Sequence, residues 1–401
     1  MTTLILFEDH RATHLQPLTL TRPVHDLRTG LLTIREKWER ALGLAAAGGP
    51  ATGHWNRLFH FKQQTSISGA GLWINARYLP TPELVVAIEQ ALSGHLRCGD
   101  DLVAVRSDLT QTAAWLAGGH PMPTNPAHDV DPAIAPSIRY PWDLFLAAPR
   151  EIAADIAALG WPAGRGAGVS ETAIIDHPER VFIHPTAVVE PGAILVAEAG
   201  LILLAAESRV MAGAILRGPV AVGEAASVQM AARISAGTCI GPRCKVGGEV
   251  ASSIFHSYSN KAHDGYVGNS VFGQWVNLGA GTTASNLKVT YGGVAMWDWP
   301  TGETVDSGQQ FLGVIMADHS KTAINTKLNT GTVCGVHSVV AADGFPPRRI
   351  PSFTWVLPGG QAVYRLDEAV VAMERMMARR SVALEPAYRE MMEAIFQAER
   401  G

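Results

Sequence analysis

A six-residue repeat of aliphatic side chains dominates the second half of the sequence. It runs through Ile183, Val189 and Leu195, and it returns in five consecutive positions: Val222, Val228, Ile234, Ile240 and Val246. This period is typical of a parallel β-helix, in which three six-residue sides make one triangular coil and the aliphatic residues point inward. A later stretch has the same spacing, so we expect the same inward positions there: Leu312, Asp318 (a polar exception), Ile324, Thr330 and Val336.

Two segments interrupt the repeat, residues 251–266 and residues 291–310. In solenoid proteins such breaks are usually inserted loops, often on the binding side. We therefore expect a binding site beside these segments.

The first 150 residues lack this repeat and instead alternate short apolar runs with helical patterns. Strands are expected at 3–7 and 71–74, and helices at 33–42, 82–92 and 111–116. This alternation predicts an α/β domain with a mostly parallel sheet. A Gly/Pro/Ala-rich linker at 162–168 and two amphipathic helices at 366–379 and 385–398 complete the pattern. We expect three domains, 1–168, 169–360 and 361–401. The tail helices are expected to cover the end of the β-helix or a neighbouring subunit.

Composition excludes several classes of partner. The chain is 47% hydrophobic and 17% charged with a net charge of −4. It lacks the excess positive charge that would attract nucleic acid or an anionic membrane surface. The sequence shows neither a secretory leader nor an apolar run of membrane-spanning length, so a cytoplasmic location is expected. The cysteines form no paired ligand motif and are expected to be reduced, buried thiols: Cys98, Cys239, Cys244 and Cys334.

The densest polar cluster lies at residues 257–266 and contains Lys261, His263 and Tyr266. Histidine is a natural general base near neutral pH, and acyl transfer requires one to take a proton from the attacking group. Glycines such as Gly279 allow a long cofactor arm to approach the backbone. By itself the cluster fits a catalytic His263 and a purely structural His263 equally well.

The order of these residues resembles the acetyltransferase half of the bifunctional GlmU-type enzymes, which are UDP-N-acetylglucosamine pyrophosphorylase/glucosamine-1-phosphate N-acetyltransferases. The match covers residues 170–345 and is strongest at 257–286. The resemblance implies a left-handed β-helix, a homotrimer and acetyl-CoA or another acyl-CoA as co-substrate. It implies that His263 is the general base. It also implies that the substrate is bound by Arg233, Lys261, Tyr266, Asn277 and Asn286. The cofactor-binding residues that it implies are Gly279, Ala280 and Thr330.

Two features depart from that family. Leu287 and Lys288 replace the tyrosine that follows the last asparagine, and residues 291–310 are extra. The identity of the acceptor is therefore open.

The whole chain resembles a shorter bacterial branch of sugar nucleotidyltransferases, with a Rossmann-like amino-terminal domain. The usual phosphate-cradling glycine loop is absent after the first strand, so Arg11 and Arg22 are the nucleotide-binding candidates. If nucleotidyl transfer is retained, Mg²⁺ is expected, with Asp9 or Asp26 as possible ligands, although either could simply cap a helix.

The leading hypothesis is therefore CoA-dependent N-acetyl or acyl transfer to an amino-sugar phosphate, coupled to nucleotidyl transfer if the first domain is active. One alternative is a sugar-1-phosphate nucleotidyltransferase whose β-helix is a trimerisation scaffold. Another is a non-enzymatic assembly protein that binds nucleotide sugars. Asp318 and His319 lie in the later coils, where a buried, hydrogen-bonded aspartate and a second polar site are both open readings.

Overall fold

The computed structural model describes residues 3–48, 70–91, 94–108 and 127–400. The helix expected at 111–116 lies outside these residues. The chain forms two compact units. The first consists of Met1–Leu15, Thr19–Leu27 and Leu32–Tyr140, and the second of Gln16–Leu18, Arg28–Leu31 and Pro141–Gly401. The domain limits expected at 168 and 360 stay a prediction.

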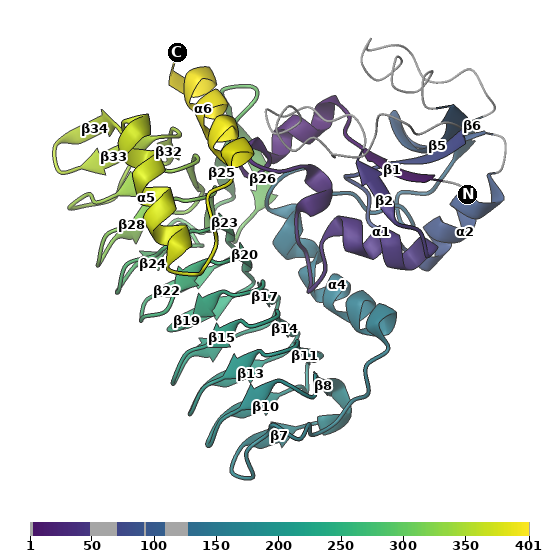
Figure 1. Ribbon diagram of the computed structural model, residues 1–401, viewed down its shortest axis with the longest axis horizontal. Helices are drawn as coiled ribbons and strands as arrows, with labels where there is room; N and C mark the ends of the chain where they lie inside the picture. Colours follow the sequence, from purple (N-terminus) through teal and green to yellow (C-terminus); the bar gives the residue numbers. More distant parts are fainter. Residues whose placement is uncertain (1–2, 49–69, 92–93, 109–126, 401) are drawn as a thin grey trace. The chain divides into compact units, whose positions relative to one another are not determined.

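The first unit is built on one six-stranded sheet (Figure 1). Its strand order is β2 (Ala46–Gly48), β1 (Thr3–Phe7), β3 (Ala70–Asn75), β5 (Asp101–Asp108), β4 (His95–Cys98) and β6 (Ala127–Asp129). Three neighbouring pairs are parallel, but β5 is antiparallel to both β3 and β4. The tight turn between β4 and β5, where Gly99 has a φ of 58°, makes those two strands an antiparallel hairpin. The sheet is thus mixed, and the mostly parallel expectation is only partly right.

Local sequence explains the two α-helices that the structure describes in this unit, α1 and α2. Helix α1 (Ile34–Leu42) begins at Thr33, which forms a capping box with Glu36, and it ends at Gly43 with a φ of 64°. Helix α2 (Pro82–Gln90) begins after Thr81, which accepts a hydrogen bond from the Leu84 amide. The helices expected at 33–42 and 82–92 are confirmed.

The second unit is a left-handed parallel β-helix whose coils stack from β7 to β33 (Figure 1). The side on which helix α4 (Asp143–Leu159) packs is called the covered face. The other two sides are called the asparagine face, after Asn260 and Asn277, and the tyrosine face, after Tyr266. The covered face contains β8 (Val181–Ile183), β11 (Ile202–Leu204), β14 (Val220–Val222), β17 (Thr238–Ile240), β20 (Ile254–Ser257), β23 (Val271–Gln274), β27 (Val314–Met316), β30 (Thr332–Cys334) and β32 (Arg349–Ile350).

The other two sides have solvent-facing residues. The asparagine face contains β9 (Val188–Val189), β12 (Arg209–Val210), β15 (Ser227–Val228), β18 (Lys245–Val246), β21 (Asn260–Lys261), β28 (Lys321–Thr322), β31 (Val339–Val340), β33 (Thr354–Leu357) and β34 (Gly360–Val363). The tyrosine face contains β7 (Ile174–Asp176), β10 (Ile194–Val196), β13 (Ile215–Arg217), β16 (Arg233–Ile234), β19 (Glu249–Ala251), β22 (Tyr266–Gly268), β24 (Thr283–Ala284) and β29 (Lys327–Leu328).

The aliphatic repeat from 183 to 246 fills the core of the β-helix, as predicted. The later stretch was predicted in the wrong register. Ile324 is 71% exposed, and the buried inward positions are Met316, Thr322, Leu328, Cys334 and Val340. Asp318 is therefore no substitute for an inward aliphatic residue. It lies at a corner, where its carboxylate accepts a hydrogen bond from the backbone N–H of Gln274 at 2.8 Å.

The two interruptions have different causes. Residues 251–266 are not an inserted loop, so that expectation is wrong. The stacked partners there are closer in sequence, with 18 residues from Val222 to Ile240 but only 15 from Ile240 to Phe255. Residues 291–310 do form an insertion, an antiparallel hairpin of β25 (Val294–Asp298) and β26 (Glu303–Gln309). The shorter coils and the hairpin both displace the six-residue count, which explains the register error.

Helices cover one side and one corner of this β-helix. Helix α4 (Asp143–Leu159) packs on β14 and β17 of the covered face. The predicted tail helices are confirmed as α5 (Leu366–Ala378) and α6 (Pro386–Arg400). They run beside the corner between the covered and asparagine faces (Figure 1). We call this corner the aromatic edge, because it carries residues with positive φ whose rings are neighbours from coil to coil: Tyr258, Trp275, His319, His337 and Phe353.

The tail helices thus cover an edge of the solenoid. Tyr388 of α6 lies 3.0 Å from the His319 ring nitrogen, and Phe396 packs edge-on against Phe353. None of the helices in the described residues is both long and apolar enough to cross a membrane.

Candidate functional site

A polar ladder crosses the tyrosine face. Arg233, Glu249 and Tyr266 are direct neighbours on adjacent parallel strands, so their side chains project from the same side of the sheet. Arg233 forms an ion pair with Glu249 at 2.8 Å, and both side chains are exposed. Exposed pairs of this kind are worth only about 0–1 kcal/mol, so an anionic ligand can replace the carboxylate.

Two asparagines hold the end of this ladder. The Asn286 amide donates to the Tyr266 hydroxyl oxygen at 2.9 Å and to the Asn269 side-chain oxygen at 2.8 Å. Burial and the nearby charge of Glu249 raise the pKa of Tyr266, although the Asn286 hydrogen bond opposes that shift. The phenol therefore stays protonated, and its hydrogen can be donated to a ligand.

A second polar ladder crosses the asparagine face. Lys245, Asn260, Asn277 and Lys321 are successive neighbours across four coils. Asn260 donates to the Asn277 side-chain oxygen at 2.9 Å. Asn277 thus lies on a different side of the prism from Tyr266 and Asn286.

The predicted base lies on the corner between these two ladders. His263 and Asp264 are exposed on the turn that joins β21 to β22, and this corner is called the histidine edge. Gly265 has a φ of 113°, and a Cβ there would lie 2.1 Å from the Thr282 carbonyl oxygen. Only glycine fits this tight stacking.

Lys261 supports that turn from inside. Its side chain is buried, and its ammonium group donates to the Gly247 carbonyl at 3.0 Å and to the His263 carbonyl at 2.8 Å. Burial lowers the pKa of Lys261 to about 8. Because both contacts are to backbone, Lys261 is placed to position His263 and not to reach a ligand.

The cofactor-binding candidates do not all come together. Gly279 and Ala280 lie on the next turn of the histidine edge, where the Gly281 amide donates to the Asp264 carbonyl at 3.1 Å. Thr330 is fully buried on the corner between β29 and β30, where the tyrosine face meets the covered face. It is therefore not on the histidine edge.

Sequence reasoning missed three residues that build the site: Glu249, Asn260 and Asn269. Two of them could have been found from spacing. Asn260 precedes Asn277, and Asn269 precedes Asn286, by the same 17 residues that separate stacked positions in this coil. Glu249 has no such signal, because its role depends only on its register with Arg233.

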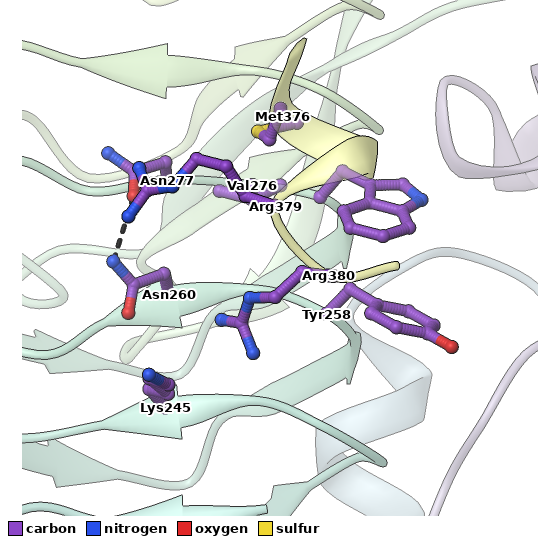
Figure 2. Close-up of a pocket in the computed structure, with 9 residues that line it drawn as sticks. Lys245, Tyr258, Asn260, Val276, Asn277, Met376, Arg379 and Arg380 are labelled. Carbon is purple, nitrogen blue, oxygen red and sulfur yellow. Dashed lines mark hydrogen bonds between the residues drawn. The ribbon is translucent and has the colours of Figure 1, made fainter. Parts of the chain in front are cut away.

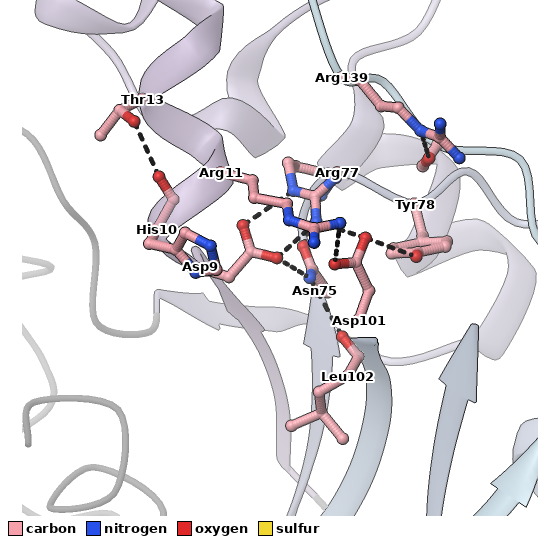
Figure 3. A network of polar contacts seen from close by, with 11 residues as sticks. Asp9, His10, Arg11, Thr13, Asn75, Arg77, Tyr78, Asp101, Leu102 and Arg139 are labelled. Carbon is pink, nitrogen blue, oxygen red and sulfur yellow. Dashed lines mark hydrogen bonds and ion pairs between the residues drawn. The ribbon is translucent and has the colours of Figure 1, made fainter. Parts of the chain in front are cut away.

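In the first unit, an ionic network lies at the carboxyl ends of β1 and β3 and at the amino end of the antiparallel strand β5 (Figure 3). Arg77, with a fully buried side chain, donates from Nε to Asp9 at 2.8 Å and from Nη2 to Asp101 at 2.8 Å. Burial opposes the charge of Asp9, but the hydrogen bonds and charge of Arg77 outweigh it and lower the pKa of Asp9. Arg11, a nucleotide-binding candidate, pairs with the other oxygen of Asp101 at 2.8 Å.

These residues do not fit a magnesium site. Both oxygens of Asp9 and of Asp101 already face arginine, and Asp26 pairs with Arg35 at 2.9 Å. Within the described ranges, no group of three or more His, Cys, Asp or Glu side chains could hold a metal ion. Arg22, the other nucleotide-binding candidate, is buried and 6% exposed.

Known proteins match parts of this chain. Residues 4–160 match the family model described as sugar nucleotidyl transferase. A bifunctional sugar-1-phosphate nucleotidylyltransferase/acetyltransferase from Sulfurisphaera tokodaii is 33% identical over 90 residues, which cover 22% of each chain. The bifunctional protein GlmU of Methanocaldococcus jannaschii is 30% identical over 121 residues, 29% of this chain and 28% of that protein. A crystal structure of UDP-N-acetylglucosamine acyltransferase is 12% identical with a TM-score of 0.28, covering 59% of this chain and 90% of that one.

The chain therefore combines a segment that matches the sugar nucleotidyl transferase family model, residues 4–160, with a left-handed parallel β-helix. The matched segments span only 22–28% of the length of these curated relatives. Over those segments the chain is similar to bifunctional sugar nucleotidyltransferase/acetyltransferase proteins, including GlmU.

Proposed function

We propose that the β-helix is a CoA-dependent acyltransferase that acts on an amino-sugar phosphate, with His263 as general base. The observation that carries this proposal is the place of His263 on the edge between the Arg233–Tyr266 ladder and the Asn260–Asn277 ladder. The GlmU relatives add independent support.

In the proposed reaction, the acceptor amine attacks the thioester carbonyl carbon of the acyl-CoA. A C–N bond forms, the C–S bond breaks, and the CoA thiolate leaves. His263 takes the proton released by the amine and returns it to the thiolate. Arg233 exchanges Glu249 for the sugar phosphate, and the Tyr266 hydroxyl donates to a sugar oxygen.

The co-substrate fits the small residues of the histidine edge. Gly279, Ala280 and Gly281 present no bulky side chain beside the turn of His263. A pantetheine arm can therefore lie against the backbone there, which places the thioester near the base.

A second copy of the chain completes the site in this proposal. Asn277 and Tyr266 project from different sides of one prism and cannot enclose the same small ligand. If the asparagine face of one subunit meets the tyrosine face of the next, both reach one ligand. A closed ring of such heterologous contacts is a homotrimer of triangular prisms.

The direct test is product formation from an acyl-CoA and a panel of hexosamine-1-phosphates, read by mass spectrometry of the acylated sugar. Matched hexose-1-phosphates without the amino group are the control. Acylation of an amino sugar and not of its hydroxyl counterpart is expected. Failure to acylate any amino-sugar phosphate above the rate without protein contradicts the proposal.

Nucleotidyl transfer is a second candidate function, favoured by the match of residues 4–160 to the sugar nucleotidyl transferase family. Because Arg77 already neutralises Asp9 and Asp101, we propose no metal-dependent step. Release of pyrophosphate from UTP or dTTP with a sugar-1-phosphate tests this activity separately from acylation.

A further inference from the structure

A positively charged pocket lies where the end of α5 meets the asparagine face (Figure 2). Its volume is about 130 Å³, which is room for several water molecules and thus for a phosphate group. Its lining contains three cationic side chains and no carboxylate: Lys245, Arg379 and Arg380.

These cations come from distant parts of the sequence but face the same strands. The side chains of Arg379 and Arg380 extend from the end of α5 across the ladder of Lys245, Asn260 and Asn277 (Figure 2). Within the described residues, the hydrogen bond of the Arg380 side chain is to the backbone carbonyl of Arg243, at 3.4 Å.

Helix geometry explains part of this arrangement. Cations near a helix carboxyl end are stabilised by the helix dipole, and Arg379 is the C-cap of α5. The dipole does not explain why Lys245, on a strand, lines the same pocket. Three like charges around one small cavity repel each other, and a bound polyvalent anion removes that repulsion.

The rest of the lining supplies an aromatic surface and a hydrogen-bond acceptor. Tyr258 and Trp275 stack with ring centroids 4.2 Å apart, and Tyr258 is half-buried. The side-chain oxygen of Asn260 is buried and has no hydrogen-bond partner in the described structure. A ligand that brings a donor group satisfies this oxygen.

We propose that this pocket binds the phosphate monoester of an organic phosphate whose ring packs on Tyr258. Lys245, Arg379 and Arg380 hold the phosphate, and Asn260 accepts from a hydroxyl or amino group of the ligand. Both a free nucleotide and the 3′-phosphoadenosine end of CoA have this chemistry. Asn277 also belongs to the proposed acyl-transfer site, so the test measures binding alone, and its failure leaves acyl transfer open.

The experiment is calorimetric titration of the full chain at low salt with matched pairs of compounds. One pair is CoA and dephospho-CoA, the other is AMP and adenosine. The proposal expects the phosphorylated member of at least one pair to bind about tenfold or more tightly, and this preference to weaken as salt is added. A preference within the CoA pair alone identifies CoA as the source, and a preference for AMP identifies a free nucleotide.

Variants then locate the binding site. Arg379→Gln and Lys245→Gln should each reduce the affinity for the preferred compound about tenfold. Arg375→Gln is the matched control, because Arg375 is exposed in the last turn of the same helix and does not line the pocket. These side chains are exposed, so the variants should keep the melting temperature of the parent. Equal affinity within both pairs, or unchanged affinity in both pocket variants, overturns the proposal.

Discussion

The Asn286 amide nitrogen donates at 2.9 Å to the hydroxyl oxygen of Tyr266, which lies 20 residues earlier in the sequence. This contact uses an acceptor position of the phenol and leaves its hydrogen directed elsewhere. The arrangement gives Tyr266 a fixed orientation before any ligand arrives.

Removing that hydroxyl should therefore weaken acceptor binding. In Tyr266→Phe, we expect the KM for the amino-sugar phosphate to rise about threefold to tenfold, the usual effect of one hydrogen bond, while kcat stays near the parent value. Steady-state kinetics over a range of acceptor concentrations measures this. A fall in kcat with unchanged KM contradicts a binding role.

The predicted base has a different signature. His263→Ala should lower kcat about 10²–10⁴-fold, because proton removal by a positioned side chain contributes that much. The melting temperature and CoA affinity should stay near those of the parent, since the side chain is exposed. His177→Ala, which alters another exposed histidine, in an early coil, is the control. Parallel losses of stability and CoA binding in His263→Ala indicate a structural residue instead.

The placement of Asn277 and Asn286 on different faces predicts complementation between chains. Asn277→Ala and Asn286→Ala should each be impaired alone. Mixed oligomers, made by unfolding and refolding the two variants together, should regain activity. At some interfaces the intact asparagine face of an Asn286→Ala chain then meets the intact tyrosine face of an Asn277→Ala chain. Activity equal to the mean of the two separate variants shows that each site is drawn from one chain.

The buried ionic network predicts a large loss of stability in the first unit. Arg77→Met removes the buried counter-charge of Asp9 and leaves Asp101 paired with Arg11 alone, which should cost about 3–5 kcal/mol. Arg97→Ala breaks an exposed pair with Asp129 and should cost no more than about 1 kcal/mol. Urea unfolding of both variants measures the difference. Equal losses contradict a dominant role for the network.

The aromatic edge predicts sensitivity to acid. Burial lowers the pKa of His337 well below its usual 6.5, and the charges of Lys321 and His319 act in the same direction. Below pH 6.5 the unfolded chain therefore binds more protons than the folded chain, and stability falls by up to about 1.4 kcal/mol per pH unit. His337→Phe should reduce this loss.

Hydrogen exchange of residues 332–340 between pH 8 and pH 5 is the appropriate measurement, because it reports on the second unit alone. The first unit has its own acid-sensitive group, His25, whose pKa burial lowers to about 4. The same pH dependence of protection in the parent and in His337→Phe contradicts the assignment.

Several features could be predicted from sequence because they depend on local spacing. The six-residue repeat places Val222 and Val228 in the core, and Thr33 with Glu36 marks the start of α1. The six-residue count first changes in the shorter coil after Ile240 and changes again at the β25–β26 hairpin, so Ile324 lies on the surface.

Features that depend on long-range contacts were invisible in the sequence. The Arg77 network joins residues 24 and 68 positions apart, and Arg380 reaches the strands near Arg243 across 137 positions. No periodicity relates such residues, because their proximity is set by how the coils and helices pack.

The tail helices change how the solenoid can unfold. In a repeat protein each coil touches only its neighbours, so the ends can fray one coil at a time. Here Arg380 bonds to the carbonyl of Arg243, while Arg400 bonds to that of Ser352 at 2.9 Å. The segment from Arg380 to Arg400 thus connects coils that are more than a hundred residues apart. Unfolding of the last coil would also release the contact that this segment makes with the coil of Arg243. The carboxyl-terminal half of the β-helix should therefore melt as a single cooperative block.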